Sequence, residues 1–234
     1  MSKEKASELN TRFQELSSGK FLQNLSTEFS DKIRFATSLG AEDQVITHML
    51  ASGGIPIDIF TLDTGRMFYE SYELIDKVQS RYGINIKIVF PDAGDVEKMV
   101  NEKGLNLFYH SIENRKQCCG IRKIKPLQKA LQGMSAWITG LRREQSPTRT
   151  DLQLVEWDAG NQLIKANPLL NWTEDEVWDY IKKHKIPYNT LHDKGFPSIG
   201  CQPCTRAVLP GEDIRSGRWW WEDPKTKECG LHKQ

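Results

Sequence analysis

The chain has 234 residues, a formal net charge of +1 and a hydrophobic content of 38%. This length can bury a hydrophobic core without disulfide cross-links, and the near-neutral charge gives no signal for nucleic-acid binding. The amino-terminal residues lack an apolar signal core, and no stretch approaches the roughly 18 apolar residues of a membrane span. We therefore expect a cytoplasmic protein that binds neither nucleic acid nor a membrane.

The first part of the chain predicts strands that alternate with helices. Residues 1–30 have apolar side chains at helical spacing, which predicts an N-terminal helical segment. Short apolar runs with β-branched residues predict strands at 32–38, 55–63, 84–91 and 136–144. Helical spacing is found at 45–50, 66–83, 94–104 and 114–133. Pro126 is expected to bend or divide the last of these helices. This alternation is typical of an α/β fold with a parallel sheet.

The last part of the chain predicts one more strand, one more helix and a loop-rich end. Residues 162–170 predict a later or edge strand. Thr173 and Glu176 form a capping box, which starts an amphipathic helix within 171–187. The regular pattern fades from about residue 195. We therefore expect an α/β domain over 1–204, which binds a nucleotide and a metal cluster, and a C-terminal extension over 205–234 that carries the catalytic cysteine.

Three polar stretches follow predicted strands, namely SLGAED at 38–43, LDTGR at 62–66 and TGLRREQS at 139–146. Ligands of open parallel sheets bind beyond the carboxyl ends of the strands. The small residues of the first stretch allow a close backbone approach at a helix N-terminus, where unpaired N–H groups can bind an anion. Arg142 and Arg143 can reach a phosphate or sulfate. Together the stretches favour an anionic, nucleotide-like ligand, although none is a Walker A or dinucleotide motif.

The cysteines form two pairs, Cys118–Cys119 and Cys201–Cys204, and one single residue, Cys229. An odd number of cysteines in a cytoplasmic chain argues against a disulfide framework, so we expect four ligands and one free thiol. Adjacent cysteines on a helix are awkward ligands for one zinc ion but suit a 4Fe–4S cluster, which offers a separate iron to each thiolate. The pattern favours the cluster, with zinc and four incidental thiols as the alternatives.

Cys229 lies in the terminal sequence ECGLHKQ, where no apolar periodicity indicates a buried core position. Either this thiol is an accident of an exposed terminus, or the tail is a mobile arm that carries a nucleophile. A thiolate is a competent nucleophile for attack at sulfur. The three tryptophans at 219–221 precede this tail, and we interpret them as packing that anchors it.

The segments KQCCGIRKIKPL, GCQPCTRAVLPGEDIRSGRW and ECGLH together resemble the assimilatory sulfonucleotide reductases, and more narrowly the bacterial iron–sulfur adenylylsulfate (APS) reductases. The resemblance covers nearly the whole chain from about residue 30. It implies a Rossmann-like, parallel-sheet domain of the adenine nucleotide α-hydrolase type with a flexible C-terminal tail. It also implies a 4Fe–4S cluster on the two cysteine pairs, and a dimer or tetramer.

The resemblance further implies reduction of APS to sulfite and AMP, in assimilatory sulfate reduction and cysteine biosynthesis. Cys229 would form an S-sulfocysteine that thioredoxin resolves. Stabilising the phosphosulfate charge needs convergent cations, and the candidates are Lys123, Arg142, Arg143, Arg215 and Arg218. By family analogy the nucleotide pocket includes Ser38, Gly40 and Arg66, with Asp63 at the same sheet edge as Arg66.

Two alternatives to APS reduction stay open. The first is reduction of 3′-phosphoadenylyl sulfate (PAPS), alone or beside APS. PAPS reductases share the ECGLH tail but generally lack both cysteine pairs, so the four cysteines favour APS. The second is a zinc-stabilised nucleotide-binding module that uses its tryptophans to contact a partner. An ATP-dependent thiolation enzyme would need an SGGKDS-type loop, from which SLGAED departs.

Overall fold

A computed structural model describes residues 1–145 and 152–223, which form two compact units. The described residues of the first unit lie within Met1–Thr61, Ser71–Lys87 and Gly133–Asn189, and those of the second lie within Leu62–Glu70, Ile88–Gln132 and the segment from Thr190. The sequence-based boundary between 204 and 205 stays a prediction.

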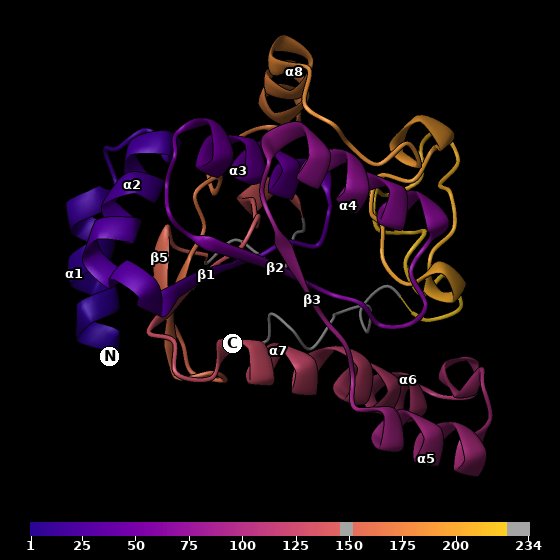
Figure 1. Cartoon of the computed structure of the whole chain (residues 1–234). Helices are drawn as coiled ribbons and strands as arrows, with labels where there is room; N and C mark the ends of the chain where they lie inside the picture. Colours follow the sequence, from indigo (N-terminus) through magenta and orange to yellow (C-terminus); the bar gives the residue numbers. More distant parts are fainter. Residues whose placement is uncertain (146–151, 224–234) are drawn as a thin grey trace. The chain divides into compact units, whose positions relative to one another are not determined.

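A six-stranded sheet with the order β3-β2-β1-β4-β6-β5 forms the centre of the first unit, although the last residues of β2 and β3 belong to the second (Figure 1). Its strands are β1 (Ile33–Ala36), β2 (Asp58–Leu62), β3 (Ile86–Val89), β4 (Ala136–Ile138), β5 (Val155–Asp158) and β6 (Leu163–Ala166). β1 pairs in parallel with β2 and β4, and β4 pairs in parallel with β6. The predicted α/β fold with a mostly parallel sheet is confirmed.

β5 is the part of the sheet that the sequence analysis missed, and it pairs antiparallel with β6 at the sheet edge. Glu156 of β5 lies opposite Lys165 of β6, and their side chains form a buried ion pair of 2.8 Å. Such charged residues break up the apolar run that would have predicted a strand. The segment 162–170 does contain a strand, but β6 is an inner strand because β5 covers it.

Helices cover the sheet of the first unit. They are α1 (Lys3–Phe13), α2 (Ser18–Phe29), α3 (Ala41–Ser52), α4 (Tyr69–Tyr82, from Ser71 in this unit) and α8 (Glu174–His184), with short 3₁₀ turns η1 (Ser30–Lys32) and η4 (Arg143–Gln145). α1 packs on β5 with α2 beside it (Figure 1). Their apolar faces are buried, and the rings of Phe13 and Phe21 lie 5.6 Å apart. The predicted capping box of Thr173 and Glu176 starts α8.

The second unit contains the helices around the first cysteine pair. They are α5 (Ala93–Lys103), α6 (Ile112–Cys119), a π-helical turn η3 (Gly120–Ile124) and α7 (Lys125–Leu131), with 3₁₀ turns η2 (Leu107–Tyr109), η6 (His192–Lys194) and η7 (Gln202–Cys204). α6 runs through the π turn into α7, with α5 alongside (Figure 1). The predicted division of this helix occurs before Pro126, which lies in the first turn of α7. The Lys125 N–H donates to the Gly120 carbonyl, one residue further than in an α-helix.

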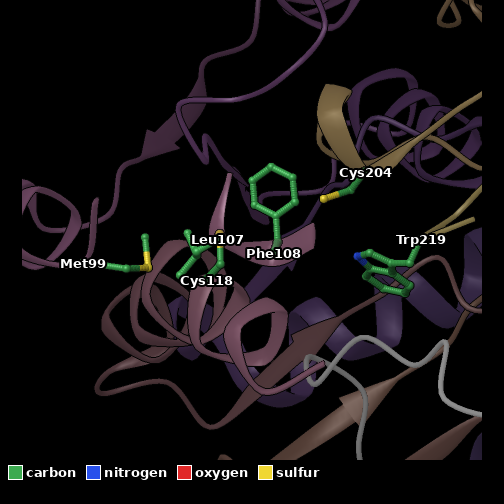
Figure 2. Close-up of a cluster of buried hydrophobic side chains, with 6 residues drawn as sticks. All are labelled: Met99, Leu107, Phe108, Cys118, Cys204 and Trp219. Carbon is green, nitrogen blue, oxygen red and sulfur yellow. The ribbon is translucent and has the colours of Figure 1, made fainter. Parts of the chain in front are cut away.

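The second unit has its own hydrophobic core, shown in Figure 2, and it includes two of the paired cysteines. Its buried members are Met99, Leu107, Phe108, Cys118, Cys204 and Trp219. The described part of the extension joins this core, since the Trp219 N–H donates to the Cys204 carbonyl at 3.1 Å. In the described ranges, no helix is both long enough and apolar enough to span a bilayer.

Candidate active site

The carboxyl ends of β1 and β4 are neighbours in the first unit, because Phe35 of β1 lies opposite Ile138 of β4. The strand order changes direction here, which is where open α/β sheets bind ligands. Ser38 and Gly40 follow β1, and Gly40 is the N-cap residue of α3. The predicted nucleotide loop therefore lies at the ligand-binding edge of this unit.

Asp43 joins the two loops at this edge. The Ser38 hydroxyl donates to Asp43 Oδ2 at 2.6 Å, and the backbone N–H groups of Ser38 and Gly140 also donate to this carboxylate. A Cβ at Gly140 would collide with the Asp43 carboxylate, so this position needs a glycine. The SLGAED and TGLRREQS loops are thus held together by hydrogen bonds to the Asp43 carboxylate.

The Asp43 carboxyl is almost completely buried. Burial raises its pKa to about 7, although the hydrogen bonds from Ser38 and Gly140 oppose this rise. Asp43 is therefore the one described carboxyl group with a pKa raised to about neutrality.

Arg142 and Arg143 differ in exposure. Arg142 is buried, and its Nε donates to Glu42 Oε1 at 2.8 Å, so a carboxylate already balances its charge. Arg143 is exposed, and it donates to Asn171 Oδ1 at 2.9 Å and to the Leu152 carbonyl at 3.2 Å. The structure brings Arg142 to the same edge as Ser38 and Gly40, since Glu42 lies in the first turn of α3.

In the second unit, both cysteine pairs line one cavity, which confirms that the fold brings them together. Three of the predicted substrate cations, Arg66, Lys123 and Arg218, line the same cavity. Arg115 and Arg122 also line it, although they were not among the predicted site residues. Five cations therefore surround the four thiols.

The LDTGR stretch contributes to this cavity through its backbone and through Arg66. The Asp63 carboxylate accepts the Gly65 N–H at 2.7 Å, so Asp63 stabilises a turn rather than lining the cavity. Arg66 donates to the Leu105 carbonyl at 2.8 Å, and its guanidinium lies over the ring of Phe108. Two predicted substrate residues of this unit do not line the described cavity, namely Asp63 and Arg215.

The π turn follows directly on the adjacent cysteines. On an α-helix, neighbouring side chains point about 100° apart, which makes two neighbours poor ligands for one ion. Cys118 and Cys119 end α6, and both still reach the cavity, Cys118 buried and Cys119 partly exposed. π turns are frequent at functional sites.

Three buried N–H donors at this cavity have no hydrogen-bond partner in the described structure. They are Arg122 Nε, Arg218 Nε and Trp219 Nε1. Unpaired buried donors are costly, so each favours an acceptor in the cavity. Thiolate and sulfide sulfur are such acceptors. Thr64 Oγ1 lies 3.2 Å from Cys201 Sγ and so already contacts one of the thiols.

The donor set decides which metal group could bind. Within the described ranges, no three His, Cys, Asp or Glu side chains converge on one ion position. Four thiols around one cavity, with unpaired N–H donors and surplus positive charge, fit an anionic cluster that binds one thiolate per iron. They fit a single tetrahedral zinc ion less well.

The surroundings of Cys201 and Cys204 shift the pKa values of the two thiols in opposite directions. Burial alone would raise the pKa of Cys201, but the positive charges of Lys123, Arg218 and Arg122 and the Thr64 hydroxyl bring it below its ordinary value. Burial, together with the neighbouring Cys201, raises the pKa of Cys204 to about 12. Cys201 is therefore the more readily ionised thiol of its pair.

The chain matches a known family over most of its length. A model of the phosphoadenosine phosphosulfate reductase domain matches residues 32–207. The chain belongs to this family. The resemblance to the sulfonucleotide reductases is confirmed.

Relatives with known names support a narrower comparison. The chain is 55% identical to the adenosine 5'-phosphosulfate reductase of Allochromatium vinosum over 204 residues, which cover 87% of this chain and 80% of that protein. It is 54% identical to the enzyme of the same name from Burkholderia cepacia over 205 residues, which cover 88% and 82% of the two chains.

Solved structures agree on the fold. The phosphoadenylyl-sulfate reductase of Candida auris, in its phosphate complex, aligns with a TM-score of 0.75 and 28% identity, and it covers 89% of this chain and 98% of that one. The FMN adenylyltransferase of Candida glabrata aligns with a TM-score of 0.57 and 16% identity, covering 92% and 72% of the two chains. The second likeness shows the fold alone.

Cys229 lies outside the described residues. Trp219 is 1% exposed, as the packing interpretation requires, whereas Trp220 is 40% exposed. Sequence reasoning missed Thr64 and Arg115. Arg115 precedes Cys118 by three residues, a spacing that places both on one helix face and could have indicated it.

Proposed function

We propose that this chain is a thioredoxin-dependent adenylylsulfate reductase, which reduces APS to sulfite and AMP in assimilatory sulfate reduction and cysteine biosynthesis. One observation carries the proposal: four cysteines and several cations of this chain line one cavity. The chain belongs to the reductase family, and it is about half identical to proteins named adenosine 5'-phosphosulfate reductase.

Cys229 performs the first chemical step. Its thiolate attacks the sulfate sulfur of APS, so that a bond forms between Sγ and that sulfur. The bond between the sulfur and the bridging oxygen breaks, and AMP leaves with this oxygen and the electron pair. The product on the protein is an S-sulfocysteine at Cys229.

Thioredoxin performs the second step. One of its thiolates attacks Cys229 Sγ, and sulfite leaves with the electron pair of the broken S–S bond. The second thioredoxin thiol then displaces Cys229 from the mixed disulfide. In total, the sulfate sulfur gains two electrons, two thioredoxin thiols become a disulfide and two protons are released.

The described residues bind and orient the substrate in this proposal. In the first unit, the Ser38–Gly40 loop and the N-terminus of α3 bind nucleotide at the sheet edge. Arg143 supplies an exposed positive charge there, whereas Arg142 is balanced by Glu42. In the second unit, Arg66, Lys123 and Arg218 line the cysteine cavity and supply positive charge there, which suits an anionic group.

The four paired cysteines would hold the 4Fe–4S cluster. When bound, this cluster supplies a fixed charged centre that links the two cysteine segments, while thioredoxin supplies both electrons. Lys123 and Arg218 lie at the same cavity wall as the thiols, and their charges lower the pKa of Cys201. These cations therefore favour the anionic form of the cysteine that would bind iron.

The reductant, the location and the oligomeric state of the enzyme are also part of the proposed function. We expect thioredoxin as reductant, a cytoplasmic location and a homo-oligomer, either a dimer or a tetramer. Size-exclusion chromatography with light scattering measures the last of these.

The test is sulfite release from APS and from PAPS in parallel, with reduced thioredoxin. The expected result is a brown protein with about four iron atoms per chain, as the cluster composition requires, which releases sulfite from APS faster than from PAPS. Faster release from PAPS would instead support PAPS reduction, for which the Candida auris likeness is the supporting observation. A colourless zinc protein without sulfite release would contradict the proposal.

A further inference from the structure

Arg115 and Glu222 form a buried, two-pronged ion pair in the second unit. Arg115 Nε donates to Glu222 Oε1 at 2.9 Å, and Arg115 Nη2 donates to Glu222 Oε2 at 2.7 Å. The side chains are 1% and 4% exposed. This fork-to-fork geometry fixes both position and direction.

The two residues join the cysteine cavity to the end of the described chain. Arg115 lies on α6, three residues before Cys118, and its side chain lines the cavity. Glu222 lies three residues after Trp219, and the Glu222 N–H donates to the Trp219 carbonyl at 2.8 Å. The Arg115 guanidinium also lies over the Trp219 ring, 4.6 Å from its centroid.

The backbone at Trp219 supports the idea of a constrained anchor. Trp219 has a φ of 43°, in the left-handed region that a bulky side chain rarely adopts. Such a conformation persists where its surroundings over-determine it, and strained residues gather at functional sites. Here the Cys204 carbonyl, two guanidinium groups and the Glu222 pair hold the residue in place.

Folding alone does not explain a buried ion pair at this place. Buried pairs are weak contributors to stability, because removing two charges from water offsets their attraction. An apolar pair of similar volume would serve packing as well. Unlike an apolar contact, two parallel hydrogen bonds between a guanidinium and a carboxylate also fix the relative orientation of the two side chains.

We propose that the Arg115–Glu222 pair is a positioning device for Cys229. The proposal rests on the proposed function, since it takes Cys229 as the nucleophile. Cys229 is the seventh residue after Glu222 in the sequence, and a chain of this length reaches at most about 25 Å. Fixing Glu222 to Arg115, which lines the cysteine cavity, therefore limits how far Cys229 can lie from Arg115. Arg115 and Glu222 act through the tail and do not contact the reacting atoms.

The test compares Glu222→Gln and Arg115→Lys with the matched control Glu212→Gln. Glu212 also pairs with an arginine of the same extension, Arg206, at 2.8 Å, but its side chain is 30% exposed and does not line the cavity. Three quantities are measured: iron content, amide hydrogen exchange at 217–222, and the single-turnover rate of S-sulfocysteine formation at saturating APS.

Glu222→Gln is expected to keep its iron and its APS affinity, to exchange faster at 217–222, and to react roughly a hundredfold more slowly, the scale of a misplaced reacting group. Arg115→Lys is expected to lie between this variant and the wild type, because it keeps the charge and loses the fork. Glu212→Gln should match the wild type.

Two outcomes would overturn the inference. One is an unchanged single-turnover rate in Glu222→Gln. The other is a rate that falls only in proportion to lost iron in both variants, which would make the pair a support for the cluster. An inactive wild-type enzyme would instead refute the proposed function, while the exchange comparison would still report whether the pair holds the segment.

Discussion

The hydroxyl of Thr64 lies 3.2 Å from the Sγ atom of Cys201, although 137 residues separate them in the chain. The Thr64 carbonyl also accepts a hydrogen bond of 2.6 Å from Arg122 Nη1. A single residue of the LDTGR stretch thus contacts one cysteine segment and the π turn that follows the other.

Replacing Thr64 by valine should weaken metal retention. The variant keeps the side-chain shape but removes the hydroxyl next to a proposed iron ligand, and loss of such contacts typically lowers metal affinity or activity roughly tenfold or more. We expect the visible absorption of the variant to bleach faster in the presence of a chelator. Thr27→Val is the matched control, because the exposed Thr27 hydroxyl donates to the Gln23 carbonyl within α2 and Thr27 lies in the first unit, not at the cysteine cavity. Equal bleaching rates for the two variants would show that Thr64 does not support the cluster.

Breaking the buried pair of Glu156 and Lys165 should destabilise the edge of the sheet. Glu156→Gln leaves the Lys165 ammonium buried without its counter-charge, which costs about 3 kcal/mol or more. We expect a thermal midpoint several degrees below that of the wild type in a scanning fluorimetry experiment. The control Glu144→Gln changes a 60% exposed side chain and should leave the midpoint unchanged. A wild-type midpoint in Glu156→Gln would disprove this role of the pair.

Asp43 should titrate near neutral pH. Burial raises its pKa to about 7, so the folded state holds a proton that the unfolded carboxyl, with a pKa of about 3.9, releases. The contribution of Asp43 to folding stability is therefore greatest below about pH 4 and decreases as the pH rises to about 7. The carbon-13 shift of its carboxyl carbon, assigned by its loss in Asp43→Asn, measures the midpoint. A midpoint close to 4 would contradict the expected shift.

The fold was predictable from the sequence where one local pattern specified one element. β1 and β2 are short apolar runs, and the capping box of Thr173 begins α8 as expected. β5 was not predictable in this way, because Glu156 depends on a partner in another strand. The π turn was also missed, since an α-helix and a π turn have similar residue patterns near Pro126.

In the candidate site, too, the features with a local sequence pattern were predictable, and those that depend on a distant partner were not. The two cysteine pairs have local patterns, so their grouping as one set was predictable, and the fold does place them at one cavity. Arg115 and Glu222 are 107 residues apart, and neither belongs to a motif that names its partner. The assignment of Asp63 to the substrate stays a prediction, and in the structure its carboxylate accepts the Gly65 N–H.

The central claim is that Cys229 takes the sulfur from APS. The most direct measurement incubates the iron-loaded enzyme with APS and without thioredoxin, and then maps the modified peptide by mass spectrometry. The account predicts one SO₃ group on Cys229, released as sulfite when reduced thioredoxin is added, and no modification in a Cys229→Ser variant that keeps its iron. Sulfite release by Cys229→Ser, or an SO₃ group on another cysteine, would contradict it.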